Sequence, residues 1–200
     1  MIPYALACLL SAAPADFKKV DETDGVLIES RPVEGSPIVE LRLTTTTTKS
    51  VDSLCEAVFG DGKFDPEEPD LKSRKIISES ADERVTYDQI SPPLVANRDY
   101  AVKAKRTQLS DTQCSMAFSA ANELAPPKPE GWVRITKLWG EWKFERGADG
   151  KTKITYVIFS DPAGSIPTFM IEGSRRKFAL QWMKRIIARG KDPEAVPPAK

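Results

Sequence analysis

The stretch from Lys75 to Phe159 is a succession of strand-like segments, and no segment long enough to form a helix separates them. The segments are Lys75–Ser80, Glu83–Ile90, Tyr100–Leu109, Gln113–Ala120, Gly131–Leu138, Glu141–Arg146 and Lys151–Phe159. Parallel neighbours need a crossover of roughly a dozen residues or more, whereas a tight turn can join antiparallel ones. The short loop Gly147–Gly150 fits such a hairpin. This stretch therefore predicts an antiparallel β-sheet.

Apolar and polar residues alternate along several of these segments. In one of the most regular, Trp142 and Phe144 share one face while Lys143 and Glu145 share the other. Alternation of this kind is typical of a sheet with one face in the core and one in water. The apolar face then needs another layer to cover it.

One long helix is predicted to supply that cover, about Pro167 to Arg189. It follows a turn at Asp161–Gly164 and has an apolar stripe that includes Ile171, Ala179 and Ile186. The remaining elements are predicted nearer the N-terminus: strands at Gly25–Arg31 and Ile38–Thr45, the second prolonged by the threonines of Thr44–Thr48, and a short helix at Ser50–Val58. The predicted class is α+β, a curved antiparallel sheet wrapped around a long C-terminal helix.

Composition excludes several kinds of chemistry. The chain contains no histidine, which removes every His-dependent catalytic triad and the commonest metal ligand. Lys plus Arg number 29 and Asp plus Glu also number 29, so no overall charge draws the chain to nucleic acid. No phosphate-binding glycine loop, paired-cysteine metal motif or nucleophile elbow is present. We expect no metal, no cofactor and no catalytic residue.

The two ends are predicted to lie outside the folded domain, which spans residues 16–190. Residues 1–15 form an apolar run ending in small residues, which predicts a signal peptide and export to the periplasm or the extracellular space. No basic residue precedes the run, so an upstream start or a first helix with a cytoplasmic location stays open. Residues 191–200 contain three prolines and are predicted to be a disordered tail. Cys55 and Cys114 are predicted to be packed free thiols, with a disulfide as the alternative.

Five motifs occur in the order and spacing of a known family. They are Asp24–Val26, the proline-rich bend and Arg-Asp pair within Ser91–Tyr100, the Gly-x-Trp strand of Gly140–Phe144, the strand Lys151–Tyr156 and the segment Asp161–Pro167. Together they resemble the START (StAR-related lipid-transfer) domain family over about residues 20–190, and in particular its short bacterial form. The resemblance implies a helix-grip fold with an apolar cavity between sheet and helix.

The resemblance also implies a non-enzymatic function, the binding and transfer of one lipid or sterol-like molecule by a monomer. Candidate wall residues are Tyr87, Val102, Ala104, Met116, Phe118, Ile135, Trp142, Tyr156, Ile158, Phe169, Phe178 and Trp182. The alternative for each of them is ordinary core packing between helix and sheet. A second alternative for the whole chain is a helix-grip enzyme, cyclase/aromatase-like or hydrolase-like, acting on a hydrophobic substrate.

Several charged positions have competing interpretations. Arg98 and Asp99 are interpreted as a structural ion pair that fixes the bend, rather than as catalytic groups. Asp88 lies near an acidic pocket position of sterol-carrying relatives, but by alternation it shares a face with Thr86 and not with Tyr87. Glu67 and Glu68 are expected in a solvated acidic loop, Asp61–Asp70. In this region and at Pro93–Leu94 the chain departs from the family pattern, so the ligand cannot be copied from relatives.

Two further features concern exchange of the ligand. The basic face of the last helix, Arg175–Arg185, is expected to be solvated, with contact to anionic lipid headgroups as the alternative. A loop over the pocket mouth, either Ser160–Ile166 or the Gly147–Gly150 hairpin, is expected to open when the ligand enters or leaves.

Overall fold

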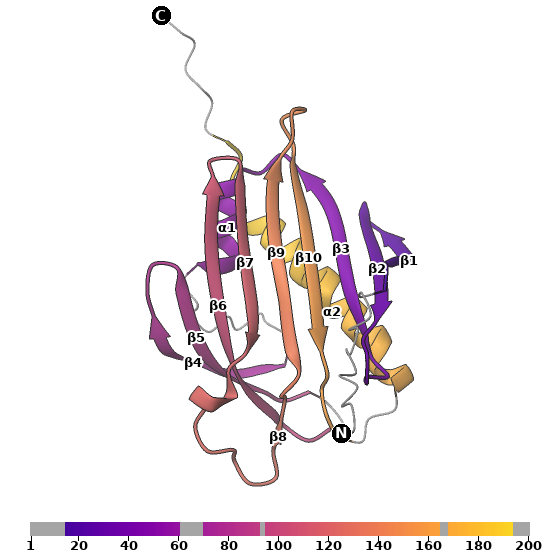
Figure 1. Ribbon diagram of the computed structural model, residues 1–200, viewed down its shortest axis with the longest axis vertical. Coiled ribbons are helices and arrows are strands. Elements are labelled where there is room, and N and C mark those ends of the chain that lie inside the picture. Colours follow the sequence, from indigo (N-terminus) through magenta and orange to yellow (C-terminus); the bar gives the residue numbers. More distant parts are fainter. Residues whose placement is uncertain (1–14, 61–69, 93–94, 165–167, 194–200) are drawn as a thin grey trace, which may run out of the picture.

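The computed structural model describes residues 15–60, 70–92, 95–164 and 168–193, with side chains for all of these except 168–170 (Figure 1). Residues 1–14 of the predicted signal peptide, most of the acidic loop Asp61–Asp70 and most of the predicted tail therefore lie outside the described residues. Within the described ranges, no helix is both long enough and apolar enough to cross a membrane.

The described residues form ten strands and two α-helices. The strands are β1 Lys18–Thr23, β2 Val26–Pro32, β3 Val39–Thr47, β4 Leu71–Glu79, β5 Glu83–Ile90, β6 Arg98–Ser110, β7 Gln113–Ala120, β8 Val133–Arg134, β9 Leu138–Arg146 and β10 Thr152–Ser160. The helices are α1 Val51–Phe59 and α2 Thr168–Arg189, with a 3₁₀ turn at Asn122–Leu124. This is the α+β class predicted from the sequence.

All the long strands join one antiparallel sheet in the order β1-β2-β3-β10-β9-β7-β6-β5-β4, while the two-residue β8 pairs in parallel with β6. The hairpin at Gly147–Gly150 is confirmed, with Arg146 opposite Thr152 across it. The threonine run also extends β3 as predicted, because Thr44–Thr47 pair with β10.

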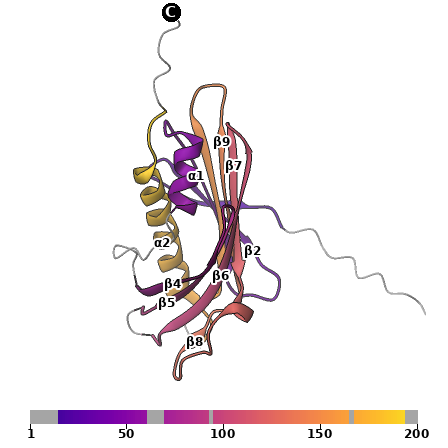
Figure 2. The ribbon, with the colours of Figure 1, turned by 90° about the vertical axis from the view of Figure 1, so that its left-hand side faces the viewer.

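The sheet is curved, and both helices lie on its concave side. Figure 2 shows α1 and α2 on one side of the sheet, with β4 and β5 curling round toward them. The apolar face of the sheet and the inner stripe of α2 form one core, in which Trp142 stacks on Tyr156 with ring centroids 3.8 Å apart. Met183 and Ile186 of α2 are almost fully buried against it.

The sequence analysis missed one strand and misplaced another. β1 is polar, and five of its six residues are exposed, so no apolar alternation marks it. The predicted strand Gly131–Leu138 shrinks to β8, and its last residue instead begins β9. Between β8 and β9 the Ile135 amide donates to the Asp99 carbonyl oxygen at 3.0 Å, and the Ile135 carbonyl oxygen accepts from the Asn122 side chain at 2.7 Å.

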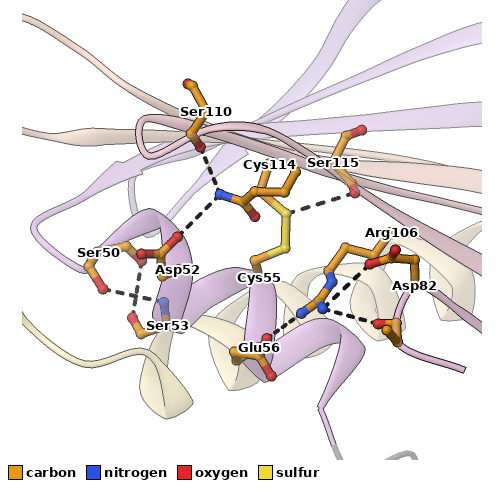
Figure 3. The surroundings of a disulfide bond; sticks show 12 residues. Ser50, Asp52, Ser53, Cys55, Glu56, Asp82, Arg106, Ser110, Cys114 and Ser115 are labelled. Atoms are coloured by element: carbon orange, nitrogen blue, oxygen red, sulfur yellow. Dashed lines mark hydrogen bonds and ion pairs between the residues drawn. A yellow bond between two sulfur atoms is a disulfide. The ribbon is translucent and has the colours of Figure 1, made fainter.

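The prediction that Cys55 and Cys114 are free thiols is wrong. A disulfide joins them, with Cα atoms 6.3 Å apart, and it connects α1 to β7 (Figure 3). Polar contacts flank it: Arg106 of β6 pairs with Glu56 of α1, and Asp52 accepts a hydrogen bond from Gln108 at 3.3 Å. Helix α1 is therefore joined to the β6–β7 hairpin by three side-chain contacts, at Asp52, Cys55 and Glu56.

Gly140 in β9 occupies a place with no room for a side chain. A Cβ atom there would lie 2.3 Å from the Val157 carbonyl oxygen and 2.4 Å from the Phe118 ring. We expect Gly140→Ala to lower the free energy of unfolding by about 1–3 kcal/mol through overpacking. Urea unfolding measures this change in the free energy of unfolding. The matched control is Gly173→Ala in α2, where no atom lies within 4 Å of the new methyl group and stability should hold or rise. Equal effects of the two substitutions would contradict the close approach at Gly140.

Candidate ligand-binding cavity

A cavity of about 430 Å³ lies between the concave face of the sheet and α2. Its volume falls within the range of roughly 300–1,000 Å³ that is usual for small-molecule sites. Residues of β3 to β7, β9 and β10 line it on the sheet side, and α1 contributes Ala57, Val58 and Phe59 at one end. The disulfide and the polar contacts of α1 therefore hold one end wall in place.

Most of the predicted wall residues do line this cavity. They are Val102, Ala104, Met116, Phe118, Ile135, Trp142, Tyr156, Ile158, Phe178 and Trp182. The side chain of Phe169 lies outside the described residues. Trp142 and Tyr156 belong to the packed core as well as to the wall, so for them the two interpretations, core and pocket, hold together.

Tyr87 does not line the cavity, and its assignment to the wall is corrected here. Its ring is buried on the opposite face of β5, where its hydroxyl donates to Asp99 Oδ2 at 2.8 Å. The cavity face of β5 instead carries Arg84, Thr86 and Asp88. Alternation separated the two faces of β5 correctly, but the more polar face is the concave one. The sequence did contain a signal for this: one face of this strand is polar, whereas the strands that follow it have an apolar face.

Asp88 therefore lies in the cavity wall, with 2% of its surface exposed. Arg74 of β4 donates to both of its oxygens, from Nε to Oδ1 at 2.8 Å and from Nη2 to Oδ2 at 2.7 Å. Such a bidentate pair satisfies a buried carboxylate, which would otherwise be costly to desolvate. Sequence reasoning had no means of finding Arg74, because the pairing depends on the register of β4 with β5.

Arg84 forms a second ion pair where α1 meets the sheet. Its Nε donates to Glu79 Oε1 at 2.9 Å, and its Nη1 donates to the carbonyl oxygen of Phe59, the last residue of α1. A cation near a helix C-terminus is favourable because the unpaired carbonyl groups carry partial negative charge. Arg84 therefore closes this end of the cavity, and Glu79 neutralises its charge.

Arg175 of α2 lies in the cavity wall, not on the outer basic face where the sequence analysis placed it. Its Nη1 donates to the Val39 carbonyl oxygen at 2.8 Å and to Glu172 Oε1 at 3.3 Å. Burial lowers the pKa of Arg175, and the charge of Glu172 opposes that shift. Nη2 is buried and meets no hydrogen-bond acceptor among the described residues.

The cavity opens beside α2. Ser174 and Phe178 line it yet are exposed, Phe178 by 39%. Ser160 also lines it, at the start of one loop predicted to move, whereas no residue of the Gly147–Gly150 hairpin is among the lining residues. Glu67 and Glu68, predicted to be solvated, lie outside the described residues.

The Arg98–Asp99 pair predicted from the sequence does not form. Asp99 is fully buried and is bound by Arg134 of β8, from Nε to Oδ1 at 3.2 Å and also from Nη2 to Oδ2. Arg98 instead donates to backbone carbonyl oxygens, those of Ala96 and Pro162. Arg98 and Asp99 therefore fix different parts of the bend, each through partners of its own and not through a pair with each other.

Comparison with known proteins places these features in a family. A family model described as the START domain matches residues 69–195. An uncharacterized protein of Pseudomonas aeruginosa is 29% identical over 164 residues, which cover 80% of this chain and 79% of that protein.

Solved structures share the fold. A STAR-related lipid transfer protein from Xanthomonas axonopodis superposes with a TM-score of 0.74 at 22% identity, covering 86% of this chain and 97% of that chain. Human STARD10 gives a TM-score of 0.72 at 16% identity, over 86% of this chain and 72% of its own. The Zhui aromatase/cyclase of Streptomyces is more distant, at 0.53 and 12% identity, over 74% of this chain and 91% of its own. The sheet wrapped on α2 is thus a helix-grip fold.

Proposed function

This chain belongs to the START domain family, and on that premise we propose that its cavity binds one lipid-like molecule and transfers it without chemical change. The observation that carries the proposal is the apolar cavity of about 430 Å³ between sheet and helix. Burying an apolar tail there is favourable by roughly 0.8 kcal/mol per methylene group. A few polar wall groups would orient the head of the molecule.

Binding is preferred to catalysis because two charged groups of the wall already have protein partners. Asp88 is held at both oxygens by Arg74, and Arg84 is held by Glu79. A general acid or base has to exchange a proton with the substrate, and a carboxylate held by a bidentate arginine is poorly placed for that. The same arrangement suits a carrier, since it keeps a buried polar wall satisfied whether or not a ligand is present.

We propose that exchange takes place during brief contact with a membrane surface. The mouth of the cavity carries exposed Phe178, and Lys177 beside it is exposed as well. An apolar ring next to a cation suits the boundary between acyl chains and anionic headgroups.

The direct test is to purify the full chain, extract it with organic solvent and identify bound molecules by mass spectrometry. We expect one lipid-like species in near-stoichiometric amount. Delipidated protein should in addition bind a fluorescent fatty acid or a fluorescent sterol. Protein that yields no lipid and binds neither probe would contradict the proposal.

A substitution that fills part of the cavity should weaken binding without unfolding the protein. Ala104 lines the cavity, and in Ala104→Trp the indole would occupy the space of several methylene groups. Displacing only two of them, at about 0.8 kcal/mol each, weakens binding roughly tenfold. The control is Ala117→Trp on β7, a neighbouring strand, where residue 117 is exposed. Titration with the fluorescent probe measures both variants, and equal affinities would place the ligand outside the cavity.

A further inference from the structure

We propose that the ligand is a single-chain amphiphile with a carboxylate headgroup, which Arg175 binds through its Nη2. This inference rests on the proposed binding function and names the class of molecule that the same cavity takes. It goes beyond the fold, because it depends on one side chain of this protein and on its contacts.

The guanidinium of Arg175 is held in place from two sides. Nη1 reaches the Val39 carbonyl oxygen at 2.8 Å on β3 and Glu172 Oε1 at 3.3 Å one helical turn earlier. The group also lies 5.9 Å from the centre of the Phe159 ring. Both hydrogen bonds use Nη1, so the planar guanidinium has a fixed orientation and Nη2 keeps its hydrogen atoms for another acceptor.

Nη2 of Arg175 is a hydrogen-bond donor in this wall that needs an acceptor. It is buried, and it meets no acceptor among the described residues. A buried donor without a partner is unfavourable, and an acceptor on the ligand would remove that cost. The hydroxyl-bearing residues Tyr156, Ser160 and Ser174 line the cavity too.

The charges around the cavity favour an anion over a neutral or cationic head. Its charged lining residues are Arg74, Arg84, Arg175, Arg189, Asp70 and Asp88. Ion pairs within the protein already neutralise Arg74 and Arg84, so Arg175 is the residue that favours an anion. Asp88 is already bound by Arg74, so it has little to offer a cationic ligand. Glu172 neutralises part of the Arg175 charge through a hydrogen bond at Nη1, and Asp161 also acts on that charge, but neither forms a hydrogen bond with Nη2.

The burial of Arg175 also favours an anionic headgroup. It lowers the pKa of Arg175, which means that the charged form is desolvated in this wall. A carboxylate at Nη2 would give that charge a second partner through a charge-assisted hydrogen bond. The tail would then extend along the apolar lining, past Ile158 and Trp182.

The test compares three molecules that differ only in the head: dodecanoic acid, dodecanol and dodecylamine. Each is titrated into delipidated full-length protein by calorimetry near neutral pH. We expect the acid to bind about 10- to 100-fold more tightly than the alcohol, the range for a hydrogen bond to a charged group. The amine should bind most weakly. The comparison uses the unmodified protein, so it does not depend on any variant folding.

Arg175→Gln should abolish the preference, bringing the acid to the level of the alcohol while the alcohol itself changes little. Arg175→Lys should keep part of the preference, because it retains the charge but not the planar fork. The control is Lys153→Gln on the outer face of β10, an exposed position with the same change in charge. Thermal unfolding verifies that each variant is folded.

Equal affinity for acid and alcohol, or a preference that survives in Arg175→Gln, would overturn this inference and leave the proposed function standing. Tighter binding of the amine would overturn it as well. Failure of all three molecules to bind would overturn the proposed function itself, and the inference with it.

Discussion

Asp99→Ala is expected to lower the free energy of unfolding by about 3–5 kcal/mol, the range for removing one partner of a buried ion pair. Asp99 is 0% exposed and accepts from Arg134 and from the Tyr87 hydroxyl. Its removal leaves both donors without their acceptor at the point where β5, β6 and β8 meet. Urea unfolding followed by circular dichroism measures the loss.

A surface pair provides the control. Lys103 and Glu83 join β6 to β5 at 2.9 Å, but their side chains are 44% and 38% exposed. Glu83→Ala should therefore cost less than about 1 kcal/mol. If Asp99→Ala costs no more than this control, the buried network contributes little and the bend at Arg98–Asp99 is held by other contacts.

The same network makes a prediction about alkaline pH. Burial raises the pKa of Tyr87, and its hydrogen bond to Asp99 raises that pKa further. Since the folded-state pKa lies above the unfolded value of about 10, this contribution to stability is complete below that value and is lost as pH rises through the folded-state pKa. In Asp99→Ala the pKa of Tyr87 should fall, so the alkaline loss should be smaller and finish at lower pH.

Removing the Cys55–Cys114 disulfide is the second change expected to have a large effect. The two cysteines are 59 residues apart in the sequence. A cross-link that closes a loop of this length stabilises the fold by about 4 kcal/mol, chiefly by restricting the unfolded chain. The double substitution Cys55→Ser/Cys114→Ser should lower the free energy of unfolding by about this amount.

The experiment is done in a Cys8→Ser background, so that Cys55 and Cys114 are the only cysteines. Denatured, unreduced protein should then show no thiol that reacts with a maleimide. Reduction of this background protein serves as the control, because it breaks the bond without changing the side chains' size. Two reactive thiols in the unreduced protein would show that the bond is not formed. Equal stability before and after reduction would show that the bond does not contribute to stability.

The disulfide is also relevant to the cellular compartment in which the protein functions. Disulfides persist in oxidising compartments and are rare in the cytosol. We therefore propose that the chain is exported, in keeping with the signal peptide expected from residues 1–15. The bond lies at the α1 end of the cavity, so its formation after export would also set that end wall.

Much of the fold could be predicted because its signals are local. Alternation in β6, β7, β9 and β10 identified the antiparallel sheet, and the stripe on α2 identified its cover. The missed strand β1 lacked such a signal, since most of its residues face water. Most wall residues were also predictable, because an apolar residue on the inner face of a covered sheet contacts either the core or the cavity.

The sequence by itself determined the antiparallel sheet, the covering helix and the family, because the periodicity of apolar residues and the motifs are local features of the chain. The tertiary structure alone decided which face of β5 borders the cavity, that Arg175 lies in its wall, and that Cys55 meets Cys114. Each depends on how distant segments approach one another. On β5, Tyr87 lies on the outer face, where its hydroxyl donates to Asp99, which Arg134 binds in turn. Alternation distinguishes two faces of a strand, and the curvature of the sheet decides which one borders the cavity.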